Sequence, residues 1–582
     1  MNKVVATFLV LLMSSLSGFA ESNKTTQEAD KVFVNGDIMP GAILLISNDG
    51  GKHSVRGMFL KREQAIAVSG ERILAVGSNA EIEKFKGKHT EVIDLAGHFV
   101  MPGFNDAHMH LASGGMEKLN VDLAGVKSLA EMQQRIAAKA KTTPPGEWIT
   151  GEGWDHTMWP GQKLPNREDM DEVTGDHPAV FGRVDGHISV ANSAALKLAH
   201  IGKNTADPPG GKIDRDSSGE PTGILREAAR GAVDHVIPPP TPAKRREAIQ
   251  LALADAASHG LTSIQDFSQW DDFLVYEDLE REGKLTARIS EWLPFVDPLP
   301  VLQAHRAHHP HTDSMLHTGM LKGFMDGSLG SRTAALLQPY SDDPGNSGLP
   351  QFQQDQLNKM TRERVAAGFQ IGFHAIGDRG VEMALEAFTA AENDIREKQL
   401  HAAPSSAKTD DFRFRIEHAQ VVTPEQIARF RRLKVIASMQ PNHLLTDMNW
   451  AESRIGPVRA KTSYAWKEFL ENEVRVPFGT DFPVEPLTPF RGLYAAVTRE
   501  NGAGTKSYFP EQKLTIEEAI ECYTNAPAFA EFAENEKGRI QPGLLADFVV
   551  LDRDITKVPA DEILGTQVLL TVVGGKTVYQ AH

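Results

Sequence analysis

Cysteine is almost absent from this sequence, because Cys522 is the only one among 582 residues. No intramolecular disulfide can form, so the fold must be stabilised by other interactions. A zinc site built from several thiolates is excluded for the same reason. Any metal that the chain binds would therefore be held mainly by histidine and carboxylate ligands.

Basic charge is also scarce. The chain has 61 basic and 77 acidic residues, a formal net charge of −16, and no block of basic residues stands out. This composition argues against nucleic acid as a partner. A chain of this length exceeds one ordinary domain, and 41% hydrophobic and 24% charged residues are typical of a globular protein.

Long hydrophobic runs are missing, apart from a short one at the start. Lys3 precedes the apolar residues Val4 to Met13, and small residues follow up to Ala20. This order is typical of a secretory signal peptide, and the run is too short to span a bilayer comfortably. An uncleaved membrane anchor is the alternative. We predict cleavage near Ala20, a periplasmic or secreted protein and no stable membrane anchor.

Both ends of the mature chain are rich in short strands. In residues 21–100, Asn35-Gly36 and Ser69-Gly70 each follow an apolar run and favour hairpin turns. Residues 535–582 contain similar runs, such as 546–551 and 568–573. We expect the two ends to build one small sheet domain together.

The middle of the chain, residues 101–534, alternates helical and strand-like segments. Leu129 to Ala140 and Lys244 to His259 are typical of helices. Strands are expected at 263–265, 370–373, 414–416 and 474–478. This alternation predicts a parallel α/β fold. Because a plain barrel needs roughly 250 residues, we expect an insertion, at the proline- and glycine-rich segment 144–240.

Potential metal ligands stand at the ends of several expected strands. In His108-Met109-His110 the two imidazoles lie on the same side of an extended chain. His374, His418 and Asp481 each close another apolar run. Each residue alone is more often structural, and Asp481 in Thr-Asp-Phe-Pro is also typical of a turn. Because parallel strands converge at one barrel mouth, their agreement predicts a metal site.

Several longer stretches carry a family resemblance. They include MPGFNDAHMHL, GWDHTMWP, DGHISVANSAAL, GILRE, GLTSIQDF, LKGFMDGSLGSRTA, FHAIGD, RIEHAQ, PFGTDFPV and KGRIQPGLLADFVVLD. With these stretches the chain resembles the amidohydrolase superfamily, and within it the family 3 branch that includes N-substituted formamide deformylase-like enzymes. The match runs across nearly the whole mature chain.

The resemblance implies a distorted (β/α)8 TIM barrel with a composite β-sandwich domain built from both termini. It also implies metal ligation by His108, His110, His374 and His418, with Asp481 as ligand and proton carrier. Lys322 lies where such enzymes often use a carboxylated lysine to bridge two metals. A bare ammonium group cannot ligate, so an uncarboxylated Lys322 would instead pair with Asp326 or another carboxylate.

The implied reaction is hydrolysis of a C–N bond in an amide, formamide or cyclic amide of a small molecule. A metal-bound hydroxide would attack the carbonyl, and Asp481 would accept the proton and return it to the leaving amine. Zinc suits these ligands, although manganese, iron or cobalt would also fit. The number of ions, one or two, depends on Lys322.

The resemblance also suggests residues of a substrate pocket. They are Trp154 and Asp155 in one motif, His187 after Asp185-Gly186 in another, and Glu227. His187 is a candidate catalytic donor to the developing oxyanion, and a buried structural histidine is the alternative. For Glu227 the alternative is a position on a helix surface.

A short polar stretch contains many further histidines. They are His305, His308, His309, His311 and His317. Histidine-rich tracts can bind metal, but these residues do not close expected strands. We expect a solvated loop here.

Other functions remain open at this stage. The same metal chemistry would serve an esterase or a phosphoesterase, and a non-catalytic periplasmic binding or regulatory protein on an inherited barrel is a third possibility. No G-x-S-x-G motif is present, which disfavours a serine hydrolase. Oligomeric state is not indicated by the sequence.

Overall fold

A computed structural model describes residues 27–49, 52–184, 187–400 and 411–581. The expected signal peptide, residues 1–20, and the Asp185-Gly186 pair lie outside these ranges. Among the described helices, none combines the length and apolar character that crossing a membrane requires.

The middle of the chain forms a parallel sheet that curls into a nearly closed barrel. Its strands, in order, are β21 (Ile436–Ser438), β20 (Arg415–His418), β19 (Ile371–Ala375), β18 (Leu316–Phe324), β17 (Arg288–Pro294), β16 (Leu261–Asp266) and β9 (Phe104–Met109). Residues 475–481 fill the remaining gap. Phe478 bridges Met439 on one side, and its carbonyl accepts the N–H of Ala107 in β9 on the other. Strand residues point into a continuous apolar core.

Helices with clear sequence signals cover the outside of the barrel. They include α7 (Pro242–Ser258), α8 (Trp270–Arg281), α9 (Leu299–His308), α10 (Gln354–Ala366), α11 (Asp378–Leu400) and α12 (Pro424–Leu433). Thr241 caps α7 and Thr423 caps α12, each followed by proline at the first helical position. The predicted helix 244–259 and the predicted strands 263–265, 370–373 and 414–416 are confirmed. The predicted strand 474–478 is wrong, because this segment makes only an isolated bridge at Phe478.

Two sheets lie at the β-rich end of the molecule. One combines β6 (Arg72–Gly77), β5 (Ala65–Ser69), β1 (Lys31–Val34) and β7 (Glu91–Asp94). The other combines β2 (Asp37–Ile38) and β8 (Phe99–Pro102) with β22 (Phe548–Leu551), β23 (Val568–Val573) and β24 (Lys576–Gln580). The second sheet therefore contains strands from both ends of the chain. Phe33 and Phe548 meet edge to face between the sheets, with ring centroids 4.8 Å apart.

One of the two expected hairpins is present and the other is not. Ser69-Gly70 joins β5 and β6, which pair antiparallel as expected. Asn35-Gly36 is not a hairpin turn, because β1 and β2 belong to different sheets. A Cβ atom at Gly36 would lie 2.8 Å from Cδ1 of Leu95, so a larger residue would force the Leu95 side chain to shift.

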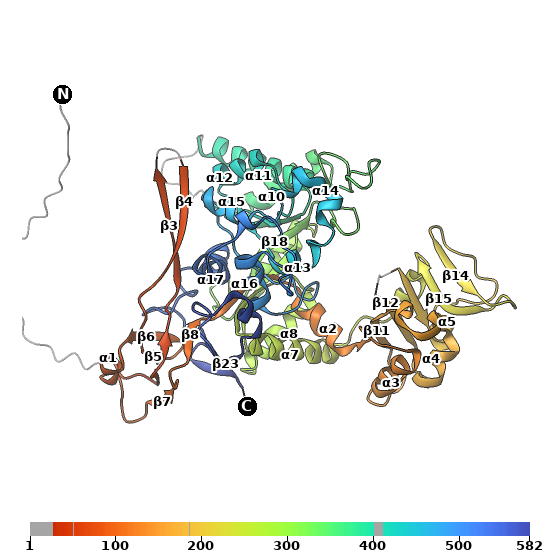
Figure 1. Ribbon diagram of the computed structural model, residues 1–582, viewed down its shortest axis with the longest axis horizontal. Helices are drawn as coiled ribbons and strands as arrows, with labels where there is room; N and C mark the ends of the chain where they lie inside the picture. Colours follow the sequence, from red (N-terminus) through yellow and green to blue (C-terminus); the bar gives the residue numbers. More distant parts are fainter. Residues whose placement is uncertain (1–26, 50–51, 185–186, 401–410, 582) are drawn as a thin grey trace, which may run out of the picture.

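The insertion forms a sheet of its own at the side of the barrel in Figure 1, and this unit begins at Val121, before the expected residue 144. Its order is β10 (Val121–Asp122), β11 (Ile149–Trp154), β12 (Ala179–Arg183), β13 (Ile188–Ala191), β15 (Pro221–Glu227) and β14 (Gly211–Arg215). Helix α3 (Leu129–Ala140) packs on one face and α5 (Ser193–Leu198) on the other. Neighbouring residues Val180 and Phe181 belong to the two separate cores. The insertion therefore has apolar cores of its own.

The histidine-rich stretch is not the solvated loop that we expected. His305 and His308 lie on α9, and His305 stacks on Trp270 with ring centroids 3.8 Å apart. His309 follows the helix and pairs with Glu277, while His317 lies in β18. Contacts with α8 order this stretch, which sequence spacing alone does not reveal.

Candidate metal centre

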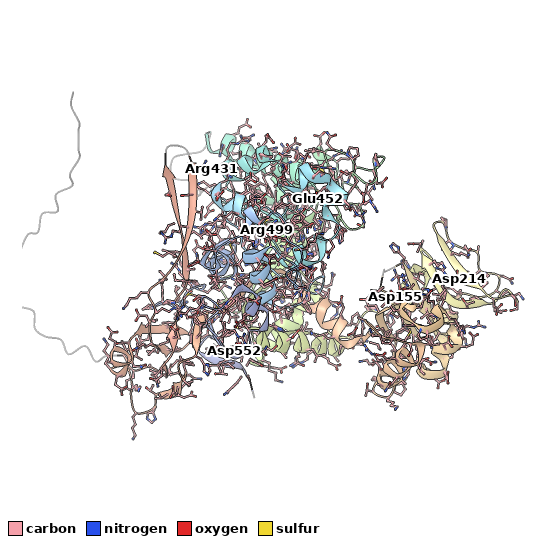
Figure 2. All side chains as sticks on the ribbon, in the orientation of Figure 1. Asp155, Asp214, Arg431, Glu452, Arg499 and Asp552 are labelled. Atoms are coloured by element: carbon pink, nitrogen blue, oxygen red, sulfur yellow. The ribbon has the colours of Figure 1, made fainter. Side chains whose placement is uncertain are left out.

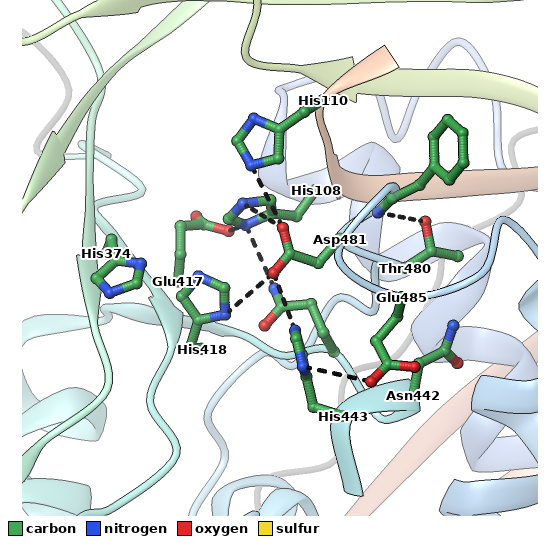
Figure 3. A network of polar contacts seen from close by, with 12 residues as sticks. His108, His110, His374, Glu417, His418, Asn442, His443, Thr480, Asp481 and Glu485 are labelled. Atoms are coloured by element: carbon green, nitrogen blue, oxygen red, sulfur yellow. Dashed lines mark hydrogen bonds and ion pairs between the residues drawn. The ribbon is translucent and has the colours of Figure 1, made fainter. Parts of the chain in front are cut away.

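The predicted ligands meet where the parallel strands of the barrel end (Figure 3). His108 lies in β9 and His110 follows it, His374 lies in β19, and His418 closes β20. Asp481 belongs to the segment that closes the barrel. Ligand atoms of His108, His418 and Asp481 all lie within 4.8 Å of one another. The barrel topology thus converts distant sequence positions into one cluster.

Two histidines present the same ring nitrogen to Asp481. The Nε2 atoms of His108 and His110 lie 3.5 and 3.3 Å from Oδ1 of Asp481. Nδ1 of His108 is bonded to Glu417 at 2.8 Å, and Nδ1 of His110 to the Phe267 carbonyl at 3.0 Å. Because each of these oxygens accepts a hydrogen bond from Nδ1–H, Nε2 carries the lone pair that faces the cluster.

The other two histidines lie side by side. Their ring centroids are 4.5 Å apart, and Nε2 of His374 is bonded to the Gly327 carbonyl at 3.1 Å. Nδ1 of His418 is buried without a hydrogen-bond partner among the described residues, and Oδ2 of Asp481 is 3.9 Å from it. A buried ring nitrogen without a partner is costly unless a ligand completes the site.

Three of the histidines are held in the neutral form. Burial lowers the pKa of His108 to about 4 and that of His374 to about 3, with the charge of Lys322 adding to both effects. Burial also lowers the pKa of His418 well below its usual value. Neutral imidazole is the form that ligates a metal.

Lys322 lies within the cluster and is only 2% exposed. Its Nζ is 3.1 Å from Nε2 of His108, and burial lowers its pKa to about 8. The alternative partner, Asp326, instead accepts backbone hydrogen bonds from Ala335 and two other residues and faces His374 at 3.5 Å. Lys322 therefore points toward the ligands.

The segment that carries Asp481 is fixed by its neighbours. The Asp481 N–H donates to the His108 carbonyl at 2.8 Å. Thr480 donates both its N–H and its hydroxyl to the buried Asp106. Although burial alone would raise it, neighbouring histidines, including His443 through its hydrogen bond, hold the Asp481 pKa well below its usual value. The carboxylate is therefore ionised.

The sequence did not assign roles to two residues of this network. Glu417 accepts from His108 and is itself bound by Arg415 at 2.8 Å. His443, on α13 (Asn442–Asp447), bonds Oδ2 of Asp481 at 2.9 Å. His443 follows the short strand β21, as the other ligands lie near strand ends. This strand is only three residues long, so its sequence does not stand out as a strand.

The predicted pocket residues all lie in the insertion. Trp154 is buried in its core and donates to the Phe181 carbonyl, and Asp155 pairs with Arg183 at 2.7 Å. His187 bonds Glu227 at 3.1 Å, with 64% of its side chain exposed. His187 is thus no buried structural histidine, and Glu227 ends a strand rather than lying on a helix. Figure 2 shows Asp155 in the insertion, at the side of the barrel.

The donor set fits a divalent metal. Neutral imidazoles and an ionised carboxylate converge in a buried site, and the ring nitrogens that point outward are bonded to a carboxylate or a carbonyl. Proteins commonly hold zinc and similar ions in this manner.

Comparisons with known proteins agree with this geometry. A sequence profile described as "Amidohydrolase family" matches residues 91–579. The putative amidohydrolase YtcJ of Bacillus subtilis is 32% identical over 528 residues, which cover 89% of this chain and 96% of the relative. The N-substituted formamide deformylase of Arthrobacter pascens is 28% identical over 541 residues, covering 89% and 95%.

A solved structure has the same fold. It is the crystal structure of an uncharacterized metal-dependent hydrolase from Pyrococcus furiosus. The two chains share 31% sequence identity and superpose with a TM-score of 0.72 over 90% of this chain and 100% of the other.

Proposed function

Because the chain belongs to the amidohydrolase family, in the family 3 branch, we propose that this metal-dependent hydrolase cleaves a C–N bond in a small amide, formamide or cyclic amide. The proposal rests mainly on the ionised Asp481 carboxylate, which lies beside ring nitrogens of His108, His110 and His418. The name of the Arthrobacter relative, a formamide deformylase, supports the substrate class.

The residues that would hold the metal are those whose side chains meet in this cluster. They are His108, His110, His374, His418 and Asp481, with Lys322 if it is carboxylated. A bound divalent ion, which we propose to be zinc, supplies Lewis acidity that lowers the pKa of water from about 15.7 to about 7 and polarises a carbonyl.

Asp481 carries the proton in this proposal. Its ionised carboxylate accepts a proton from the attacking water and returns it to the leaving amine. His443 bonds one carboxylate oxygen, Oδ2, and thereby orients the other, Oδ1, toward His108 and His110.

We further propose that Lys322 is carboxylated. Its amine nitrogen would form a bond to the carbon of CO2 and release one proton, which gives a carbamate with two ligating oxygens. The lowered pKa of the amine supports this, because only an uncharged amine can react. A carbamate at this position would bridge two ions, whereas an unmodified amine implies one.

The insertion contributes the substrate pocket in this proposal. Trp154 and Asp155 would shape it, and Glu227 orients His187, which would donate a hydrogen bond to the developing oxyanion. We also propose that residues 1–20 direct export to the periplasm or outside the cell, and that the two terminal sheets form one composite β-sandwich.

The test combines metal analysis of freshly prepared protein with a screen of N-acyl amides, formamides, cyclic amides, esters and phosphoesters. Asp481→Asn should lower kcat on the best substrate by about 10²–10⁴-fold, the usual contribution of a positioned acid–base group. Asp176→Asn, at an exposed site in the insertion, is the matched control and should keep full activity.

Full activity of Asp481→Asn would contradict the proton carrier. A preference for esters or phosphoesters would contradict the C–N assignment. Activity that survives complete removal of metal would contradict the metal mechanism, and a protein without activity on any of these classes would favour a non-catalytic role.

A further inference from the structure

A second group of metal-ligand side chains lies near the opposite end of the barrel strands. Glu277 and Glu280 stand three residues apart on the same face of α8. His309 and Asp313 lie in the loop that leads into the start of β18, whereas Lys322 lies near the end of that strand. Ligand atoms of Glu280, His309 and Asp313 lie within 4.8 Å of one another. This group is therefore separate from the candidate catalytic centre.

The ring of His309 is fixed in orientation. Its Nδ1 bonds Oε1 of Glu277 at 2.7 Å, while the other oxygen of Glu277 is bonded to His308 at 2.9 Å. Phe273 packs edge-on against the ring, and the side chain is 12% exposed. Because Nδ1 is bonded to Glu277, the Nε2 atom of the ring is turned toward Glu280 and Asp313. A carboxylate behind a histidine is a recurrent support of metal ligands.

Asp313 is oriented in the same way. Its Oδ1 accepts the backbone N–H of Met315 at 2.8 Å, which leaves Oδ2 toward His309. Glu280 approaches the same nitrogen from α8. Burial, followed by the negative charge of Asp313, raises the pKa of Glu280 to about 7. A cation between the two carboxylates would remove this repulsion.

The distances within the cluster match those between ligands of one metal ion. Nε2 of His309 is 3.4 Å from Asp313 and 3.7 Å from Glu280. Ligands at 2.0–2.1 Å from a tetrahedral zinc ion lie about 3.4 Å apart. The candidate catalytic centre has the same spacing, 3.5 Å between His108 and Asp481.

We propose that Glu280, His309 and Asp313 form a second, non-catalytic site for a divalent transition metal such as zinc. Water would complete the coordination, because the site is partly exposed. The ion would fasten the loop before β18 to α8. This inference does not depend on the proposed reaction.

The experiment measures zinc bound per chain. Full-length mature protein is stripped with a chelator, reloaded with Zn²⁺, desalted and analysed by mass spectrometry of the metal. His309→Ala should bind one ion fewer than the wild type and keep its hydrolytic activity. His311→Ala removes an exposed histidine of the same stretch and should bind as many ions as the wild type.

Two further variants separate loss of the second site from misfolding and from an error in the catalytic assignment. Glu277→Gln keeps all three ligands and should weaken the zinc affinity of this site by about 10–100-fold. A His108→Asn, Asp481→Asn protein should still bind one ion, and adding His309→Ala should remove it.

Equal zinc content of His309→Ala and wild type would overturn the proposal. So would unchanged zinc affinity of the second site in Glu277→Gln. If the catalytic assignment fails instead, the one-ion difference between wild type and His309→Ala remains.

Discussion

The barrel and the insertion place their predicted functional residues in different ways. In the barrel, ligands from distant parts of the chain come together because they lie at or near the carboxyl ends of parallel strands, or in the segment that closes the barrel. In the insertion, Trp154 is part of a core, Asp155 pairs with Arg183, and His187 and Glu227 lie together at the end of two strands. Parallel topology therefore dictates the first arrangement, whereas local packing determines the second.

The largest effect should come from Lys322. Lys322→Met keeps the length of the side chain but removes the carbamate, and with it the proposed bridge between two ions. Loss of several kcal/mol of Lewis-acid stabilisation corresponds to more than about 10²-fold in kcat. Metal content should fall in parallel. Lys322→Glu restores a carboxylate and should recover part of the kcat and part of the metal content. If Lys322→Met binds as much metal as the wild type, the proposed bridge is excluded.

A similar loss of kcat is expected from a substitution in the insertion, if the insertion takes part in the chemistry. His187→Ala removes the proposed oxyanion donor and should lower kcat by about 10²-fold without changing metal content. Glu227→Gln keeps a hydrogen-bond acceptor for His187 and should have a smaller effect. If kcat of His187→Ala equals that of the wild type, the chemistry is confined to the barrel.

His443 should have an intermediate effect in the barrel. His443→Leu removes the donor that holds Oδ2 of Asp481, so the carboxylate becomes less well oriented. We expect kcat to fall by about 10–100-fold with little change in KM. His89→Leu, at an exposed site, is the control. A change confined to KM would identify His443 as a substrate contact instead.

The smallest effect concerns stability of the insertion alone. Trp154→Phe keeps an aromatic ring in the core but leaves the Phe181 carbonyl without its donor. The free energy of unfolding of the insertion should fall by about 1–3 kcal/mol, measured by hydrogen exchange of its strands. Exchange in the barrel strands should be unchanged, and equal loss in both regions would show that they unfold together.

The sequence predicted the features that follow from local pattern and strand order. The helix Leu129–Ala140 has the predicted bounds, and the ligand cluster at the strand ends was expected from the alternation of helices and strands. Contacts that depend on tertiary packing were not predictable. Asn35-Gly36 has the composition of a hairpin turn, yet the chain crosses there from one sheet to another. His443 and Glu277 gain their roles only from residues far away in the chain.

The near absence of cysteine has a practical consequence. Cys522 is fully buried, and burial together with the negative charge of Glu521 raises its thiol pKa well above the usual value. Thiol reagents should therefore leave the native chain unmodified. A single cysteine introduced on the surface of the insertion, and another on the barrel, would be the only reactive positions. Spectroscopic labels at these two points would measure the separation of the two regions during turnover, with no need to remove a native residue first.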